Sequence, residues 1–321
     1  MSSILTFIES KNSKPKKNSF ELISYSKKLS KKLSLDLIVL TINVDNHSDL
    51  NDFGPDKIVS INDENIKQFD AKIYSDLIVQ VFKKFDSSFI VLGGGLDSKY
   101  LAPLLSIRCN AGYLSNVVSL PEEINPFTVQ RTVFSNKAYC DASIISKNKI
   151  ISISSNSFNV TKNPTNPEII NFKANIKEFK LKQESLDIAK GKISIEDADI
   201  VVSAGRGLKG PENWGIIEEF AETLGAATAC SKPVSDLGWR PHSEHVGQTG
   251  KPVSTNLYFA IGISGAIQHL AGISSSKIKV VINSDPEAPF FKAADYGVVG
   301  DAFKIIPELN EKIKAFKADI N

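Results

Sequence analysis

The sequence predicts an α/β protein with two α/β domains, each built around a parallel sheet. In the first half of the chain, short apolar runs alternate with longer amphipathic segments, which is typical of parallel strands joined by helices. A second series of apolar runs and helices begins near residue 195. The length of 321 residues also exceeds the roughly 250–300 residues that one hydrophobic core usually supports.

The first domain is expected to span residues 1–190. Its predicted strands are 4–8, 35–42 and 89–92, and its predicted helices are 20–33, 71–85 and 99–107. After position 137 the chain becomes richer in β-forming residues, and the segments 138–145 and 149–154 are separated by Lys147-Asn148. That pattern predicts an antiparallel hairpin. Residues 159–166 are polar and interrupted by proline, so they are expected to form a loop.

The second domain is expected to span residues 191–321, with the boundary in the charged segment 180–192. Its predicted strands are 198–203, 225–229, 257–261, 277–282 and 296–299. A glycine turn at 205–210 leads to a predicted helix over 212–224, and Pro211 suits the first position of that helix. An amphipathic helix over about 306–316 is expected to close the chain.

The composition gives no reason to expect nucleic-acid binding or membrane insertion. The formal net charge is +2, and the lysine clusters near the N-terminus lack the interleaved aromatic residues that stack on bases. No apolar run approaches the roughly 20 residues needed to cross a bilayer, and we expect no leader peptide before the first strand. Cys109, Cys140 and Cys230 are odd in number and far apart, which suits a reducing compartment. We therefore expect a cytoplasmic bacterial protein, or a mitochondrial-matrix protein if the source is eukaryotic.

The densest group of polar and glycine residues lies between positions 231 and 269. Two such loops, 246–251 and 262–269, flank an apolar run that predicts a buried strand. In the second loop, Ser264 and Gly265 are expected to open a helix whose first amide groups, as far as Ala266, attract anions. The arrangement predicts a site for a phosphate-bearing ring compound. No Ser-His-Asp or Cys-His arrangement is visible, which favours binding over substrate turnover.

The segment 205–210 fits the G-x-G-x-x-G dinucleotide-binding fingerprint. It leaves open the alternative of a nicotinamide-dependent oxidoreductase. That alternative requires a carboxylate at the end of the next strand to hold a ribose, whereas this chain has Ser231 and Lys232 there. Arg206, inside the motif, suits phosphate binding through two parallel hydrogen bonds.

Three further patterns have mainly structural interpretations. The triple glycine at 93–95 follows a predicted strand, which leaves open a non-catalytic nucleotide-binding module, although a structural turn is favoured. The loop 246–251 is similar to the end of a P-loop, but His245 occupies the first glycine position and Pro252 follows the lysine. His242 and His245 by themselves do not make a metal site, so no metal is expected.

Three segments of the second domain resemble the alpha subunit of electron transfer flavoprotein. They are Gln-Thr-Gly-Lys at 248–251, Ile-Ser-Gly-Ala-Ile-Gln-His-Leu-Ala-Gly at 263–272, and Asn-Ser-Asp-Pro-Glu-Ala-Pro at 283–289. The similarity covers about residues 195–321, and the first domain is similar more loosely, in layout and in Leu-Ala-Pro at 101–103. The resemblance implies a nucleotide-hydrolase-like N-terminal domain that contacts a beta subunit and has a vestigial nucleotide site. It also implies a Rossmann-like C-terminal domain that binds FAD.

The resemblance implies an electron carrier with no substrate-turnover site of its own. Such a carrier forms a heterodimer with a beta subunit and holds one FAD. It accepts electrons from flavoprotein dehydrogenases, such as the acyl-CoA dehydrogenases of fatty acid β-oxidation, and passes them singly to a membrane quinone oxidoreductase. These dehydrogenases and the oxidoreductase are then transient partners.

The resemblance also implies roles for residues of the second domain. Arg206 and Ser231 would contact the cofactor, Gln248 and Thr249 would line the flavin near N5, and His269 would approach the C2 carbonyl. The segment 264–268 would hold the phosphates and ribityl chain, and the last three residues of the set would bind the adenosine end. The implied set is Arg206, Ser231, Lys232, Val246, Gly247, Gln248, Thr249, Ser264, Gly265, Ala266, Ile267, Gln268, His269, Asn283, Asp301 and Ala302.

Lys232 stands where many members of the family have arginine. It keeps a positive charge near the flavin but lacks the planar group that stacks on a ring. Reduced flavin gathers negative charge around N1 and the C2 carbonyl. Lys232, helix-terminal amides and a cationic or hydrogen-bonding His269 would favour that charge and raise the potential.

Overall fold

The computed structural model describes residues 2–66, 68–134, 136, 138–176, 195 and 198–320. The chain divides into two compact units, the first made of residues 1–134 and 138–186 and the second of residues 135–137 and 187–321. The segment 180–192, where the domain boundary was predicted, lies outside the described residues. No described helix combines the length and apolarity that a membrane crossing requires.

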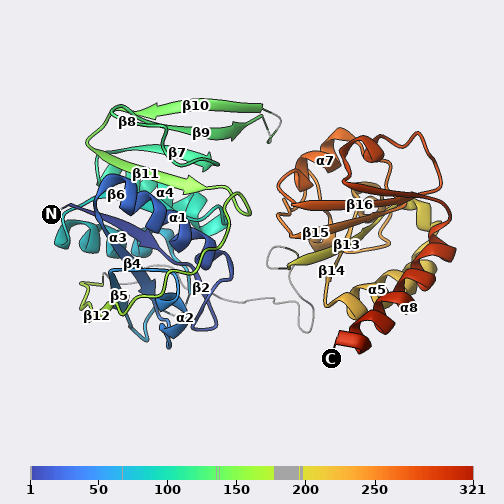
Figure 1. The fold of residues 1–321 in the computed structure, drawn as a ribbon, viewed down its shortest axis with the longest axis horizontal. Coiled ribbons are helices and arrows are strands. Elements are labelled where there is room, and N and C mark those ends of the chain that lie inside the picture. The colour runs from blue at the N-terminus through green and yellow to red at the C-terminus, as the bar shows by residue number, and fades with distance from the viewer. Residues whose placement is uncertain are drawn as a thin grey trace. The chain divides into compact units, whose positions relative to one another are not determined.

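Unit 1 is a ten-stranded mixed sheet with helices on both faces (Figure 1). The strand order is β10-β9-β7-β11-β6-β1-β4-β5-β12, and the short β8 pairs with β9. Pairing is parallel from β7 to β12 and antiparallel around β9. The strands are β1 (Ser3–Phe7), β4 (Asp36–Ile42), β5 (Lys57–Ile61), β6 (Ser87–Leu92), β7 (Ala111–Val117), β8 (Glu123–Ile124), β9 (Phe127–Val133), β10 (Ala138–Ile144), β11 (Asn148–Ile153) and β12 (Glu168–Asn171). A separate ribbon pairs β2 (Ser10–Lys11) with β3 (Lys14–Pro15).

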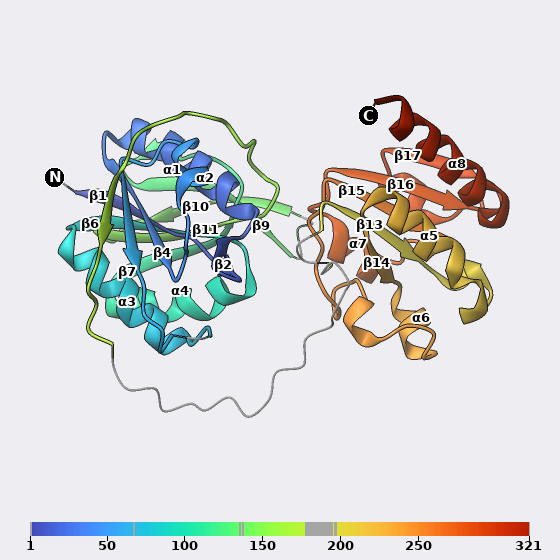
Figure 2. The same ribbon diagram turned by 90° about the horizontal axis from the view of Figure 1, so that it is seen from below.

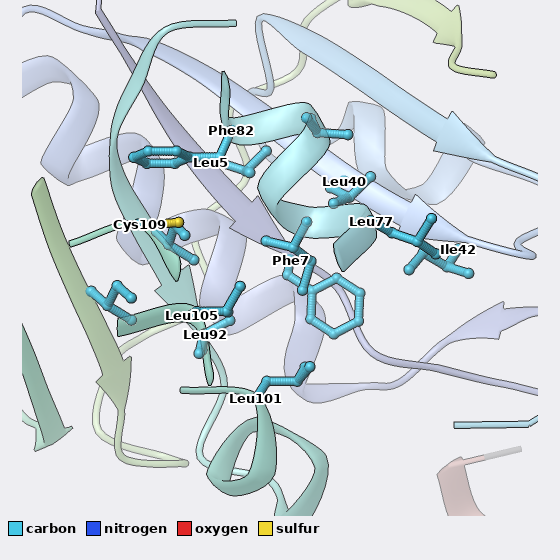
Figure 3. Close-up of a cluster of buried hydrophobic side chains, with 14 of the residues drawn as sticks. Leu5, Phe7, Leu40, Ile42, Leu77, Phe82, Leu92, Leu101, Leu105 and Cys109 are labelled. Carbon is cyan, nitrogen blue, oxygen red and sulfur yellow. The ribbon is translucent and has the colours of Figure 1, made fainter. Parts of the chain in front are cut away.

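Three helices of unit 1 each bury one apolar face against the sheet, with α1 on one side of the sheet and α3 and α4 on the other (Figure 2). They are α1 (Asn18–Leu33), the short α2 (Ser48–Asn51), α3 (Ala71–Lys84) and α4 (Leu96–Arg108). Figure 3 shows the α3–α4 side, where Leu77, Phe82 and Leu105 pack over Leu5 and Phe7 of β1. The three helices predicted in this half are confirmed, with α4 beginning three residues earlier than expected because Gly95 caps it.

The predicted hairpin between 138–145 and 149–154 is wrong. β10 pairs with β9, whereas β11 lies between β7 and β6 and is parallel to both. Ile150 and Ile151 are fully buried, as in a central parallel strand covered on both faces, while β10 is an exposed edge strand. The remaining strands of unit 1, β2, β3, β5, β7, β8, β9 and β12, were not predicted. The loop over 159–166 is confirmed.

Unit 2 is a five-stranded sheet in which all strands are parallel, in the order β14-β13-β15-β16-β17. The strands are β13 (Ile200–Ala204), β14 (Ala227–Cys230), β15 (Leu257–Ile261), β16 (Ile278–Asn283) and β17 (Tyr296–Val299). The α-helices are α5 (Gly215–Leu224), α6 (Lys232–Asp236), α7 (Ile267–Ile273) and α8 (Ala302–Ile320). α5 and α8 lie side by side on one face, and α7 lies on the other (Figures 1 and 2). All five predicted strands are present.

The helix starts in unit 2 differ from the predictions. Residues 211–214 form a 3₁₀ turn, so α5 begins at Gly215. α7 begins at Ile267, which leaves Ser264, Gly265 and Ala266 outside the helix that they were expected to open. α8 begins at Ala302, because the Asp301 carboxylate accepts a hydrogen bond from the Phe303 amide and caps the helix before its proline.

The three cysteines are unpaired and differ in exposure. Cys140 is exposed, whereas burial raises the pKa of the Cys109 thiol to about 11 and that of the Cys230 thiol to about 12. Because the thiolate is the reactive form, we expect a disulfide reagent at pH 8 to modify one thiol of the native chain and three in urea. Cys140→Ser should abolish the native reaction, and rapid labelling of that variant would contradict the assignment.

Candidate functional site

The predicted site residues lie along one edge of the unit 2 sheet. Since its five strands are parallel, their carboxyl ends share an edge, where ligands of open α/β sheets bind. Arg206 follows β13, Ser231 and Lys232 follow β14, Asn283 ends β16, and Asp301 follows β17. The segment 262–269 follows β15, the central strand. The structure therefore brings the chain-distant segments of the prediction to one edge.

The turns after β13 and β15 pack backbone against backbone. The Gly205 amide donates to the Ile261 carbonyl at 2.9 Å, and the Gly207 amide donates to the Gly262 carbonyl at 3.2 Å. A Cβ on Gly205 would lie 2.3 Å from the Gly262 oxygen, and one on Gly207 would lie 2.6 Å from the Gly262 Cα. Both glycines are thus required by this contact. After Gly205 the chain forms a 3₁₀ turn, Arg206–Leu208, which contains Gly207, and it does not continue directly as a helix. The segment therefore does not form the dinucleotide fingerprint.

The loop 246–251 is held against the start of α7. The Gln248 amide donates to the Gln268 carbonyl at 2.8 Å, and the Val246 amide donates to the Cys230 carbonyl at 3.0 Å. Gly247 and Gly272 pack so closely that a Cβ on Gly272 would lie 2.5 Å from the Gly247 Cα. Val246 and Gly247 are buried by this packing, whereas Gln248 and Thr249 are exposed.

The segment after β15 is shaped by Gly262 and Gly265, which have φ angles of +61° and +87°. A side chain would be strained at either position. Gly265 also lies against the backbone of Phe290, whose amide donates to the Ser264 carbonyl at 3.0 Å. The Asn283 side chain donates to the Ile263 carbonyl at 3.0 Å. The turn is therefore fixed from two sides, and the side chains of Ser264, Ala266, Ile267 and Gln268 remain exposed.

His269 lies inside unit 2 and not on its surface. Its side chain packs between Tyr258 and Phe290, with both ring-centroid distances at 6.1 Å. Burial lowers the pKa of His269 to about 4, and the neighbouring His245 lowers it further. A hydrogen bond between the imidazole and the Val246 backbone raises the pKa again in part. The imidazole is therefore neutral at pH 7 in the chain by itself, which favours the hydrogen-bonding role over the cationic one.

Several exposed polar side chains at this edge are free. None of them makes a hydrogen bond or ion pair with another described residue. Asp301 and Ala302 differ, since Asp301 caps α8 and Ala302 packs in the core. Ser231 is buried, and its amide donates to the Ala204 carbonyl at 3.1 Å. The free side chains are Arg206, Lys232, Gln248, Thr249, Ser264 and Gln268.

Sequence reasoning missed an arginine network that supports the loop 246–251. The Arg240 guanidinium donates through Nε and Nη2 to both oxygens of Glu244, each at 2.7 Å, and through Nη1 to Glu218 at 2.9 Å. It also lies over the Trp214 ring at 5.4 Å. The network fixes the turn His242–Glu244, which leads directly into the loop. The only signal in the sequence was the i,i+4 spacing of arginine and glutamate.

Unit 1 has a cavity of about 800 Å³ at its own carboxyl edge, and its lining includes Glu9, Asp45, Asp63 and Asp97. The strand order reverses between β1 and β6, which is the usual ligand-binding position. The buried Glu9 carboxylate lies there. It accepts hydrogen bonds from Ser98 Oγ and Lys16 Nζ, both at 2.8 Å, and it lies beside Gly95 at the start of α4. A carboxylate in this place repels phosphate, which weighs against a nucleotide-binding module.

Comparisons with known proteins agree with this geometry. One family model, the electron transfer flavoprotein domain, matches residues 4–183, and another, the electron transfer flavoprotein FAD-binding domain, matches residues 194–274. An electron transfer flavoprotein subunit alpha of Thermoanaerobacterium thermosaccharolyticum is 36% identical over 326 residues, covering 98% of each chain. The chain belongs to the electron transfer flavoprotein alpha subunits.

Other electron transfer flavoprotein alpha subunits show the same relationship. That of Bacillus subtilis is 34% identical over 82% of both chains. A mitochondrial alpha subunit of Dictyostelium discoideum is 50% identical over 143 residues, covering 44% of this chain and 40% of its own. As a member of the family, the chain is an FAD-containing electron carrier, and its FAD-binding domain is the one that contains the edge described above.

The residues at this edge of the electron transfer flavoprotein alpha subunit fit FAD. Arg206 and Lys232 supply positive charge without a protein counter-ion among the described residues, and four free polar side chains lie with them. Any metal at this edge would need other ligands, because no group of three or more His, Cys, Asp or Glu residues gathers in the described parts of the chain.

Proposed function

We propose that the sixteen cofactor-binding residues inferred from the sequence hold FAD along the carboxyl edge of the unit 2 sheet. In this proposal the chain pairs with a beta subunit, accepts electrons from flavoprotein dehydrogenases such as acyl-CoA dehydrogenases, and passes them singly to a membrane quinone oxidoreductase. The heterodimer would work in the bacterial cytoplasm, or in the mitochondrial matrix of a eukaryote.

The observation that supports this proposal is the length of the edge. The predicted residues extend from Ser231 after β14 to Asp301 after β17, four inter-strand steps apart. At about 4.8 Å for each step, the edge spans about 19 Å. A mononucleotide would use only part of it, whereas an extended dinucleotide can contact every strand end. Lys232 and Asp301 then belong to opposite ends of the ligand.

FAD supplies the capacity to take up and release electrons one at a time, and the chain's residues hold and tune it. In the proposal, Arg206 and Lys232 provide positive charge, and the Thr249 hydroxyl would hydrogen-bond the ring system. His269 is neutral and acts as a hydrogen-bonding group. The close packing of Gly205 against Gly262 and of Gly265 against Phe290 fixes the backbone that carries these groups.

The test is co-expression of the chain with a beta subunit. We expect a yellow complex with one FAD per heterodimer, reduced by an acyl-CoA dehydrogenase and its substrate and re-oxidised by a quinone oxidoreductase. A colourless complex that does not take up FAD would overturn the proposal. A yellow complex that exchanges electrons with neither protein would overturn the assigned partners and leave the cofactor assignment standing.

Replacement of Arg206 with alanine is expected to weaken FAD binding by roughly 10–100-fold, since a charge-assisted hydrogen bond contributes about 1.5–3 kcal/mol. Lys209→Ala is the matched control, because Lys209 is a cation at the end of the same turn, lies over the Phe303 ring at 5.6 Å and is not one of the proposed cofactor-binding residues. Fluorescence titration of the FAD-depleted complex measures both constants. Equal losses for the two variants would show that Arg206 acts only through the general charge of the turn.

A further inference from the structure

His245 lies directly before the loop 246–251 and is not one of the proposed cofactor-binding residues. It is buried, with only 7% of the residue exposed. The loop folds back over it: the Lys251 amide donates to the His245 carbonyl at 2.9 Å, and Val246 pairs with Lys251 in a β-bridge. The imidazole is therefore enclosed by the loop that follows it in the chain.

The tip of this loop is a β-turn whose two ends lie against the imidazole. The Gly250 amide donates to the Gly247 carbonyl at 3.1 Å, which closes the turn and leaves Gln248 and Thr249 exposed at its corners. A Cβ on Gly250 would lie 2.8 Å from Cγ and Nδ1 of His245, and one on Gly247 would lie 3.4 Å from Nε2. Both ends of the turn thus rest on one ring, and the placement of the two corner residues depends on it.

The surroundings of the imidazole favour its uncharged form. Burial lowers the pKa of His245 below the usual value of about 6.5. The Asp236 carboxylate of α6 raises this pKa in part, and the positive charges of Lys232 and His242 lower it again. The ring is therefore neutral at pH 7.

The other titratable side chains beside His245 do not supply a counter-ion. The imidazole of His269, on α7, faces it, and a charge on either ring disfavours a charge on the other. The Glu244 carboxylate is bound through both oxygens by the Arg240 guanidinium. The Cys230 thiol, at the end of β14, keeps its proton because burial raises its pKa to about 12.

We propose that His245 is a positioning residue for the cofactor: its uncharged imidazole supports the turn from Gly247 to Gly250, and protonation of the ring releases the turn and weakens FAD binding. This inference rests on the proposed function for the identity of the ligand, whereas the link between ring and turn depends only on contacts inside unit 2. His245 acts through Gln248 and Thr249 and does not touch the cofactor in this assignment.

The direction of the pH effect follows from the two environments of the ring. In an open loop the ring is in water and titrates near pH 6.5, whereas the enclosed ring of His245 titrates at a lower pH. The closed loop is therefore fully favoured above about pH 6.5. Below it, each pH unit lowers the ratio of closed to open loop by up to about tenfold, until the pKa of the enclosed ring is reached.

The first test is an NMR titration of the full chain free of FAD. The sequence has four histidines, so the ring signals are few, and His245→Gln identifies those of His245. We expect His245 to titrate below pH 6.5 and the amides of residues 247–250 to shift with the same midpoint. Those amide shifts should be absent from His245→Gln. A ring that titrates at or above pH 6.5, or turn amides that do not follow it, would overturn the inference.

The second test is the dissociation constant of oxidised FAD from the complex with a beta subunit, measured by fluorescence between pH 5.5 and pH 7.5. We expect this constant to be roughly 3–10-fold higher at the acid end for the unsubstituted chain. His245→Gln keeps a planar polar side chain that does not titrate, so its constant should vary by less than about twofold. Affinity that is unchanged or higher at acid pH, or a pH profile that His245→Gln leaves intact, would overturn the inference.

His242→Gln is the matched control. His242 begins the 3₁₀ turn that leads to His245, but it is exposed, and its Nδ1 lies 2.8 Å from the Ser235 hydroxyl oxygen. This variant should keep the pH dependence of FAD binding. If the complex binds no FAD at any pH, the proposed function fails, and the NMR titration of the free chain still decides the role of His245.

Discussion

Replacement of Gly205 with alanine is expected to destabilise unit 2 by about 3 kcal/mol and to abolish stoichiometric FAD binding. The added Cβ would lie 2.3 Å from the carbonyl oxygen of Gly262, which is backbone of the neighbouring strand end and has no rotamer to move to. Overpacking of a tight core costs about 1–3 kcal/mol, and a backbone contact belongs at the upper end. Urea unfolding followed by circular dichroism, with FAD content measured by absorption, tests both parts.

Gly215→Ala is the control for this experiment. A Cβ on Gly215 meets nothing within 4 Å, and the residue begins α5 with a helical φ and ψ. The substitution should leave FAD binding intact and stabilise the chain by up to about 1 kcal/mol, because alanine has fewer unfolded conformations and a higher helix propensity. If Gly205→Ala behaves like this control, the backbone contact between the two turns does not position the site.

Replacement of Arg240 with alanine is the second change with a large expected effect, about 3 kcal/mol of lost stability. The Glu244 side chain is only 9% exposed and would lose both of its guanidinium hydrogen bonds. Removal of one partner of a buried ion pair typically costs about 3–5 kcal/mol, and we use the lower value because Arg240 and Glu244 lie near the surface. The turn His242–Glu244 should loosen, and FAD affinity should fall with the loop that follows it.

Two further variants distinguish the stability lost by leaving the buried Glu244 charge unpaired from the stability lost by breaking an exposed ion pair. Lys314→Ala breaks exposed ion pairs with Glu219 and Glu311 and should leave the unfolding midpoint unchanged. A double variant, Arg240→Met with Glu244→Leu, should regain most of the stability lost by Arg240→Ala, since no buried charge is then left unpaired. A double variant as unstable as Arg240→Ala would show that the arginine acts mainly through its packing on Trp214.

The sequence predicted the strands of unit 2 well because most of them are apolar runs. β15 and β17 have the predicted bounds, and the remaining strand predictions differ by one or two residues at their ends. In unit 1 the pattern predicted strands over 138–145 and 149–154, which are present as β10 and β11, but it did not show which strands they pair with. Pairing is decided by burial on both faces of β11, and that burial depends on helices far away in the chain.

The site was predictable as a set of segments and not as a set of contacts. The sequence motifs identified the loops after β13, β14 and β15, which parallel pairing brings to one edge. The need for glycine at 205 and 207 follows from the approach of Gly262, which no local pattern shows. Tyr258 looked like an ordinary strand residue, and the burial of His269 became evident only when Phe290 and the loop 246–251 were placed around it.

The carboxylate of Glu9 has a consequence for how the carrier responds to the cell. The Glu9 carboxylate, paired with Lys16 at 2.8 Å, occupies the crevice of unit 1 where an adenylate would place its phosphates. The phosphates of ATP, ADP and AMP would therefore have to displace Glu9 from Lys16 to bind there. We expect unit 1 to be insensitive to cellular energy charge, so that the rate of electron delivery follows the supply of reduced donor and not the adenylate pool.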